Sequence, residues 1–278
     1  IVHVHVAHSL VPLATYITKK FKPLWKRLIF TPHFHNRGFS WHTNVAWALY
    51  RPILGIIVKS ADAIHAVSPY EAILLKTKFR VNPIVIPHGV SEDVLSHRWK
   101  PPEKFIVIYS GQLMKYKRVS LLIKAMSLLN EKNMDAKLVI IGSGPEKTKL
   151  MDMARKLKVK AEFLPPQPRN MYLKYLANSS VLCYLSESEA FCVTVLEALA
   201  IGLPVVVVKP WGNLFRSYSR VKVLSSNPTP KEICKALISF RHMKFLSREK
   251  VPTWSEVADE IEKLYSAPKE ACPLKCDM

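Results

Sequence analysis

Short apolar runs alternate with amphipathic stretches along the first third of the chain. The runs predict strands near Val2–Val6, Leu28–Thr31, Ala63–Val67 and Ile84–Pro87. The stretches between them predict helices near Ser9–Lys20, Trp41–Lys59 and Pro69–Phe79. This alternation is typical of a parallel sheet with helices on both faces.

The same pattern restarts after Pro101-Pro102, which we interpret as a linker. Strands are expected near Phe105–Tyr109, Lys137–Ile141, Ala161–Leu164, Val181–Leu185, Val205–Val208 and Val221–Leu224. Helices are expected near Val119–Asn130, Glu146–Leu157, Asn170–Asn178, Val193–Ile201, Lys231–Phe240 and Ser255–Tyr265.

Two such units in series predict an α/β protein with two Rossmann-like, doubly wound domains facing a cleft. We place an N-terminal domain at 1–98, a C-terminal domain at 99–250, and a C-terminal helix and tail at 251–278. The chain starts inside an apparent strand, so we expect the N-terminal domain to be incomplete.

Composition narrows the class of protein. The 278 residues are 49% hydrophobic, which suits globular domains, and no window of about 20 apolar residues is free of charge. The nearest, 45–58, is broken by Arg51-Pro52, and we expect a buried helix there. The five cysteines lack zinc-site spacing, and a reducing cytoplasmic compartment is the default expectation.

The net charge of +20 indicates an anionic partner or a lysine-rich solvated surface. Basic and apolar residues interleave between Tyr16 and Leu28, although Pro23 must interrupt any helix there. The cations are Lys19, Lys20, Lys22, Lys26 and Arg27. Peripheral contact with an anionic membrane and a plain solvated helix face both remain open.

The segment 186–204 carries the most specific chemistry. Glu189 precedes a predicted helix that starts at Val193, and Glu197 lies about one turn inside it. A helix N-terminus offers unpaired N–H groups and partial positive charge, which suit a phosphate. We therefore expect a diphosphate at the helix start, ribose hydroxyls on Glu197 and sugar hydroxyls on Glu189.

Three other strand ends of the second domain add candidate ligand contacts. After the first strand, Gly111 and Gln112 lead to Lys117, which can reach a diphosphate. Gly142 and Gly144 form a Gly-rich turn that we expect near the nucleotide. The turn 165–169 ends in Arg169, which could stack on or pair with a base; a rigid proline turn is the open alternative.

In the first domain, the strand Leu28–Thr31 leads into a loop with His33, which could contact a sugar hydroxyl or support leaving-group charge. The other histidines are more often core or surface residues. Paired carboxylates could also belong to a hydrolase, but the helix-borne Glu197 fits binding better. No serine nucleophile elbow or phosphate-loop motif is present in the sequence.

These residues resemble the retaining glycosyltransferases of family 4, which have the GT-B fold. The resemblance runs through 66–71, 86–90, the loop from Gly111 to Lys117, and Glu189 to Glu197 with Gly202-Leu203-Pro204 behind it. It implies that Glu189 contacts the donor sugar, Glu197 the ribose and Lys117 the diphosphate, and that His33 lies near the transferring sugar.

The chain departs from the family pattern at several positions. Gln112 stands where arginine is usual, with Lys115 or Arg118 as candidate replacements, and Arg118 stands where glycine is usual. Ala190 and Cys192 replace the two glycines that flank Phe191. With Val193, these residues complete the expected donor-binding segment.

The sequence thus predicts a cytoplasmic enzyme, or one peripheral to the inner membrane face, that moves a hexose from a nucleoside-diphosphate sugar to a glycan, lipid or small-molecule hydroxyl. We expect no metal, no cofactor other than the donor, and no nucleic-acid partner. Two alternatives stay open: a GT-B-fold nucleotide-sugar epimerase and a non-catalytic binding relative.

Overall fold

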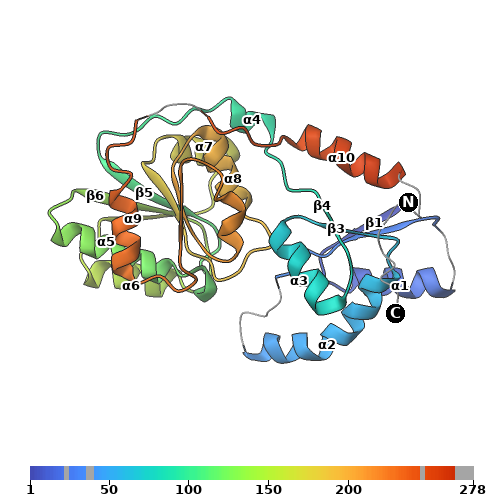
Figure 1. The fold of residues 1–278 in the computed structure, drawn as a ribbon. Helices are drawn as coiled ribbons and strands as arrows, with labels where there is room; N and C mark the ends of the chain where they lie inside the picture. Colours follow the sequence, from blue (N-terminus) through green and yellow to red (C-terminus); the bar gives the residue numbers. More distant parts are fainter. Residues whose placement is uncertain (22–24, 36–40, 245–247, 267–278) are drawn as a thin grey trace. The chain divides into compact units, whose positions relative to one another are not determined.

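The computed structural model describes residues 1–21, 25–35, 41–244 and 248–266 (Figure 1). The chain divides into two compact units. The first contains residues 1–89 and the chain from 252 onward, and the second contains residues 90–251.

The first unit is built on a four-stranded parallel sheet in the order β1-β2-β3-β4. Its strands are β1 (Val2–His5), β2 (Leu28–Thr31), β3 (Ala63–Ala66) and β4 (Ile84–Val85). Its helices are α1 (Val11–Phe21), α2 (Trp41–Ser60), α3 (Pro69–Phe79) and α10 (Trp254–Ser266).

Alternation along β2 gives this sheet two apolar faces. Leu28 and Phe30 pack in one cluster with residues of α2 and α3, including Leu54 and Phe79. Ile29 instead joins a second cluster that contains Val257 and Leu264 of α10. The last helix therefore covers the opposite face of the sheet from α2 and α3, and it belongs to the first unit.

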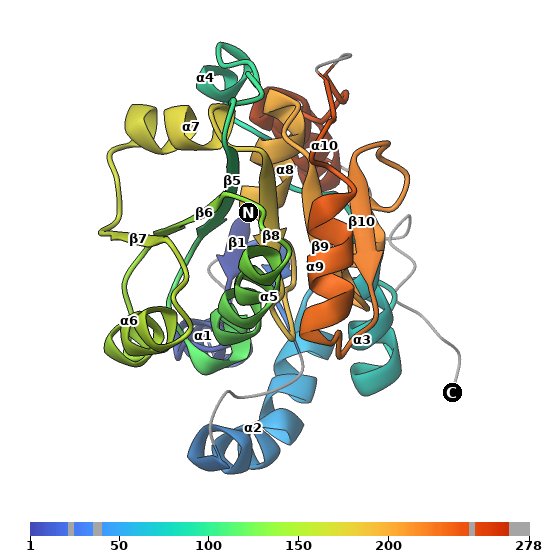
Figure 2. The ribbon, with the colours of Figure 1, turned by 90° about the vertical axis from the view of Figure 1, so that its left-hand side faces the viewer.

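The second unit has a six-stranded parallel sheet in the order β10-β9-β8-β5-β6-β7. Its strands are β5 (Phe105–Ser110), β6 (Ala136–Ile141), β7 (Ala161–Leu164), β8 (Val181–Tyr184), β9 (Val205–Val208) and β10 (Val221–Leu224). Its helices are α4 (Glu92–Leu95), η1 (Lys115–Lys117), α5 (Val119–Glu131), α6 (Lys147–Lys156), α7 (Arg169–Ala177), α8 (Val193–Ile201), η2 (Trp211–Phe215) and α9 (Pro230–Ile238). Figure 2 shows α5 and α9 together on one face, with α7 and α8 on the other.

The two parallel-sheet α/β units confirm the predicted architecture, but the units begin and end elsewhere than expected. The division falls after Gly89, not after 98, because α4 packs against α8 and Asp93 binds Arg169. Pro101-Pro102 therefore lies inside the second unit. The helix from 251 onward is part of the first unit rather than a separate segment.

Two helices of the first unit also differ from expectation. The segment 45–58 is helical, but Leu49 is 73% exposed, so the expectation of a buried helix is wrong for one of its faces. The predicted basic face between Tyr16 and Leu28 is partly neutralised: the Lys19 ammonium donates to the Asp62 carboxylate at 2.9 Å, and Arg27 is buried. Lys22 and Pro23 lie outside the described residues.

Candidate functional site

The carboxyl ends of the second unit's strands surround a cavity of about 370 Å³. It is lined by Ser110, Gly111, Gln112, Ile141, Gly142, Ser143, Pro166, Gln167, Tyr172, Val193, Thr194 and Glu197. Five of the predicted site residues are in this set: Gly111, Gln112, Gly142, Val193 and Glu197. Ligands of open α/β sheets bind at such strand ends.

Two glycines let the loops after β5 and β6 approach each other. Gly142 has φ of 151°, and a β-carbon there would collide with the carbonyl oxygen of Gly111. Gly144 packs against the backbone of Leu113 instead and does not line the cavity. The first glycine shapes the cavity wall, whereas the second holds the loop behind it.

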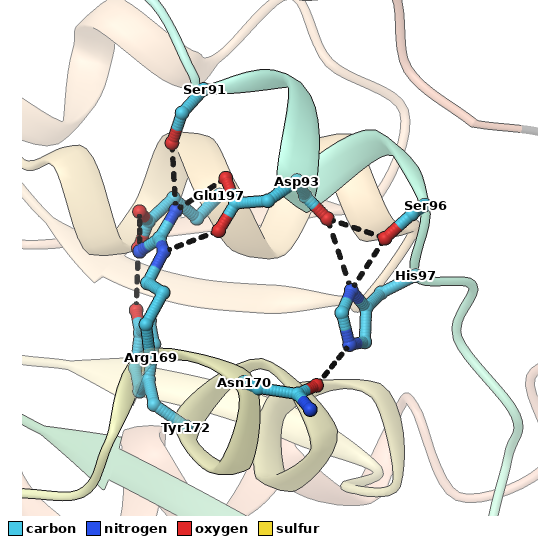
Figure 3. A network of polar contacts seen from close by, with 8 residues as sticks. All are labelled: Ser91, Asp93, Ser96, His97, Arg169, Asn170, Tyr172 and Glu197. Carbon is cyan, nitrogen blue, oxygen red and sulfur yellow. Dashed lines mark hydrogen bonds and ion pairs between the residues drawn. The ribbon is translucent and has the colours of Figure 1, made fainter.

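Glu197 lies on the second turn of α8, and its carboxylate is held at the cavity by two donors (Figure 3). The Tyr172 hydroxyl donates to Oε2 at 2.6 Å, and Arg169 Nη1 donates to Oε1 at 2.5 Å. The residue is only 6% exposed, yet it lines the cavity. Because each carboxylate oxygen has two acceptor sites, the group keeps acceptor capacity for a ligand.

Arg169 holds Glu197 rather than lining the cavity. Its Nε donates to Asp93 at 2.8 Å, and its Nη2 donates to the Ser91 hydroxyl at 3.0 Å (Figure 3). The hydrogen bond from Arg169, with a further one from Ser91, lowers the pKa of Asp93 to about 2. These contacts link α4 to α8, and the expected contact of Arg169 with a base stays a prediction.

Lys117 and Glu189 form an ion pair beside the cavity. The Lys117 ammonium donates to Glu189 Oε1 at 2.5 Å and to the Tyr184 hydroxyl at 3.1 Å. Burial lowers the pKa of Lys117, but the adjacent carboxylate raises it more, so the net pKa lies above its usual value. The Tyr184 hydroxyl also lies 3.1 Å from where a β-carbon would stand on Gly111. The Tyr184 side chain thus lies between the Lys117–Glu189 ion pair and Gly111 of the cavity wall.

The N-terminus of α8 follows Cys192, whose buried thiol makes no capping hydrogen bond. The N–H groups of Val193 and Thr194 have no acceptor within the helix, and both residues line the cavity. Ala190, Phe191 and Cys192 do not; the Phe191 ring packs against Phe215 at 5.8 Å. The start of α8 is thus available to a ligand. The three residues before it do not line the cavity, and Phe191 packs against Phe215 instead.

The loop after β5 shows how the departures from the family pattern are accommodated. Arg118 adopts the left-handed conformation, with φ of 55°, that glycine takes most easily. Its guanidinium binds Glu187 at 3.1 Å and the Ser226 carbonyl at 2.6 Å, so it does not replace the cation absent at Gln112. Lys115 is exposed and stays a candidate for that replacement.

His33 lies at the carboxyl end of β2 in the first unit, within a row of histidines. Its ring stacks 5.6 Å from His5 and 5.7 Å from His88. Burial, with the neighbouring His88 and His5, lowers the pKa of His33 to about 4. The imidazole is therefore neutral at pH 7, and it can donate or accept a hydrogen bond.

Three residues that support the site are not among those that the sequence predicts: Tyr172, Asp93 and Glu71. Tyr172 stands three positions after Arg169 on α7, a spacing that places both on one helix face. Glu71 accepts the N–H groups of Phe34 and Val67 and so fixes the loop that carries His33. The pattern Ser68-Pro69-Tyr70-Glu71 indicates the start of a helix, but it does not indicate that Glu71 binds the loop of His33.

The described ranges contain no group of three or more His, Cys, Asp or Glu arranged to hold a metal ion. Across the same ranges, no helix is long and apolar enough to span a bilayer.

Known proteins show the same architecture. HepE from Anabaena, solved in complex with UDP and glucose, superposes with a TM-score of 0.75 over 96% of this chain and 78% of that chain, at 14% identity. This likeness confirms the GT-B fold.

Two curated relatives match parts of the sequence. An uncharacterised glycosyltransferase of Haemophilus influenzae is 29% identical over 153 residues, 54% of this chain and 43% of that protein. The N-acetyl-alpha-D-glucosaminyl L-malate synthase of Bacillus anthracis is 30% identical over 107 residues, 38% of this chain and 28% of that protein. The chain therefore spans less than half the length of these relatives.

Two family descriptions cover nearly the whole chain. Glycosyltransferase Family 4 matches residues 1–94, and Glycosyl transferases group 1 matches residues 93–259. The second match includes the cavity, the α8 N-terminus and both glutamates. The chain belongs to the glycosyl transferases group 1 family.

Proposed function

We propose that this protein transfers a hexose from a nucleoside-diphosphate sugar to an acceptor hydroxyl, with retention at the anomeric carbon. The observation that carries the proposal is the cavity that joins the start of α8 to the Glu197 carboxylate. A phosphate group and a ribose are the neighbouring parts of a nucleotide that these two features bind best.

In the proposed complex, the ribose hydroxyls donate to Glu197 while the diphosphate receives hydrogen bonds from the N–H groups of Val193 and Thr194. The narrow contact between Gly111 and Gly142 lets the backbone line this site. Lys117 adds positive charge beside it, and Glu189, held by Lys117, accepts hydroxyls of the donor sugar.

Catalysis then rests on positioning and on stabilising the departing diphosphate. Lys117 and the α8 N-terminus supply positive charge where the leaving group gains negative charge. We propose that an oxygen of that phosphate takes the acceptor's proton on the same face of the sugar, which gives retention without a protein nucleophile. That no metal ion is needed also stays a prediction.

We propose the acceptor only by its chemical class, as a hydroxyl group of a glycan, a lipid or a small molecule. The relative from Bacillus anthracis is a synthase of N-acetyl-alpha-D-glucosaminyl L-malate, which supports a hydroxyl acceptor but not its identity. We further propose that the enzyme acts in the cytoplasm, in peripheral contact with a membrane. An epimerase would change the sugar with no acceptor present, so product analysis separates the two activities.

A binding titration tests the donor site. Wild-type protein is expected to bind nucleoside diphosphates, whereas Glu197→Gln should weaken that binding about ten- to a hundred-fold, because a charge-assisted hydrogen bond contributes about 1.5–3 kcal/mol. Inorganic pyrophosphate, which lacks ribose, should bind both proteins equally. Glu131→Gln, an exposed change on α5, is the matched control. Unaltered nucleotide affinity in Glu197→Gln would remove the basis of the proposal.

A further inference from the structure

Helix α2 is apolar on two opposite faces, and the core of the first unit explains only one of them. Leu54, Ile57 and Val58 are buried in that core. On the other face, an apolar stripe of four side chains is exposed. We call it the α2 stripe: Val45 (53% exposed), Leu49 (73%), Ile53 (42%) and Ile56 (54%). Spacings of three and four residues place them along one side of a helix.

A stripe of this kind is unusual on a surface that faces only water. Within the described residues, α2 carries no acidic side chain, and its cations are Arg51 and Lys59. An amphipathic helix with apolar residues beside basic ones is typical of binding in the plane of a membrane. The α2 stripe alone does not identify the partner that covers it. The charged residues beside it indicate which kind of partner fits.

The second observation is a cavity of about 390 Å³ between α2 and the C-terminal end of α3, which we call the basic pocket. Its lining is Ala48, Arg51, Pro52, Gly55, Lys59, Lys78, Phe79 and Arg80. Four of these eight residues are cationic, and none is acidic. Figures 1 and 2 show α2 and α3 as neighbours, and they are close enough that a β-carbon on Gly55 would stand 3.4 Å from the Phe79 ring.

The pocket also holds an unused donor. Arg51 Nε is buried from solvent and has no hydrogen-bond partner in the described structure. An unsatisfied buried donor is costly, so a shift of the Arg51 side chain that brings Nε to a phosphate oxygen in the pocket would be favourable. The pocket's charge and this donor both favour an anionic, oxygen-bearing ligand.

No acidic residue lines the basic pocket, and the two carboxylates of residues 1–89 are engaged elsewhere. Residues 1–89 contain eleven Lys and Arg but only two acidic residues, Asp62 and Glu71. Asp62 is held by Lys19 and the Leu28 N–H, and Glu71 is buried against the Phe34 and Val67 N–H groups. The cations of the basic pocket are therefore not neutralised by these two carboxylates.

We infer that the α2 stripe and the basic pocket together form a docking surface for an anionic phospholipid membrane. The stripe enters the boundary between headgroups and acyl chains, and the pocket receives a lipid phosphate. A second copy of the chain is a poorer occupant, because a symmetric pairing through this face would bring two cationic pockets together. A nucleic acid would leave the apolar stripe unexplained.

This inference deepens the proposed membrane contact by naming its surface and lipid class. It moves the contact from the segment 16–28, where Lys19 and Arg27 are engaged internally, to α2 and α3. It does not depend on glycosyl transfer, so its test can fail while the donor-site proposal stands.

Vesicle flotation of the full chain tests the inference. Wild-type protein should float with vesicles of phosphatidylcholine and phosphatidylglycerol, and it should not float with phosphatidylcholine alone. Each cation near an anionic leaflet contributes about five-fold to binding, so Lys59→Gln/Lys78→Gln should weaken partitioning roughly 25-fold. Leu49→Ser should weaken it about ten-fold or more, because burial of a leucine side chain contributes about 1.5–3 kcal/mol.

Matched controls lie in the second unit. Lys156→Gln/Lys235→Gln removes the same charge from exposed positions, and Met151→Ser alters an exposed apolar side chain on α6. These variants should float like wild type. Far-UV circular dichroism and the thermal midpoint, measured on the same preparations, should be unchanged in every variant and confirm that each is folded.

Three results would overturn the inference. They are absence of wild-type flotation with the anionic vesicles, equal loss in the control variants, and loss of a dimer in Leu49→Ser while vesicle binding persists. The last result, detected by light scattering, would assign the stripe to a second copy of the chain.

Discussion

Single carboxylates in this protein are positioned by partners that come from distant parts of the sequence. The spacing of Glu189 and Glu197 predicts that both lie at the donor site; Glu197 lines the cavity, whereas Glu189 pairs with Lys117 beside it. The side chains that hold it, Tyr172 and Arg169, come from α7, and Asp93 comes from α4. Their approach depends on how the elements pack, so no local pattern reveals it.

Arg169 offers the clearest test of such positioning. Arg169→Gln leaves Glu197 with Tyr172 as its remaining described partner, and the carboxylate is expected to lose its fixed orientation. We expect about ten-fold weaker binding of nucleoside diphosphates, in line with the loss of one charge-assisted hydrogen bond. Pyrophosphate binding should not change, because Glu197 is assigned to the ribose. A calorimetric titration with both ligands measures the difference.

The outcome for Arg169 also separates positioning from general damage. Arg155→Gln, an exposed change on α6, removes the same charge and is the matched control. Equal losses for pyrophosphate and nucleotide in Arg169→Gln would indicate a disturbed fold rather than a misplaced Glu197.

At the scale of elements, apolar runs locate the strands because each must be buried between two helical layers. The four valines of β9 and the run Val181–Tyr184 of β8 are buried; the predicted limits of β9 are those found, and β8 ends one residue before its predicted end. The helix α4 has four residues, too few for any periodicity, and was not predicted. The exposure of one face of α2 also does not follow from the sequence, because the hydrophobicity of a helix does not indicate which of its faces packs against the protein.

The start of α3 shows a local signal with a non-local consequence. Ser68 caps the helix by accepting the Glu71 N–H at 3.0 Å, as the Ser-x-x-Glu pattern indicates. The Glu71 side chain, however, accepts the N–H groups of Phe34 at 2.5 Å and Val67 at 2.8 Å. It thereby ties α3 to the loop of His33.

Replacement of this carboxylate should therefore destabilise the first unit. In Glu71→Gln, one oxygen becomes an NH₂ group that faces a backbone donor, so one buried N–H loses its acceptor. We expect a loss of about 1–3 kcal/mol in unfolding free energy, measured by chemical denaturation. Glu131→Gln again serves as the exposed control. Stability equal to wild type would show that the carboxylate does not hold the His33 loop.

At the scale of the whole molecule, the repeated strand–helix alternation predicts two doubly wound units, and the fold confirms them. The position of their division was not predictable, because proline pairs mark turns wherever they occur. Whether residues 90–98 join one unit or the other depends on contacts with α8 and Arg169. The return of the chain to the first unit through α10 likewise follows from packing against Ile29 and Ala63.

Four neighbouring histidines of the first unit, His3, His5, His33 and His88, form a row whose protonation makes the stability of the molecule depend on pH. Burial and mutual repulsion lower the pKa values of His3, His33 and His88 to about 4. Between the ordinary value of 6.5 and this value, the unfolded chain binds protons that the folded row does not, so stability falls as the pH falls. Glu71 acts in the opposite sense, because burial raises its pKa to about 7 and its protonation favours the folded state.

The loss of stability from the three histidines exceeds the gain from Glu71 as the pH falls. A protein of net charge +20 also gains further self-repulsion on acidification. We therefore expect the thermal midpoint to decrease from pH 7 to pH 5, more steeply at low ionic strength. In His33→Asn/His88→Asn the decrease should be smaller, because two of the groups that must stay neutral are gone. His97→Asn, a change at a half-buried position in the second unit, is the control and should keep the wild-type slope. A midpoint that rises on acidification would show that Glu71, and not the histidine row, dominates the proton balance.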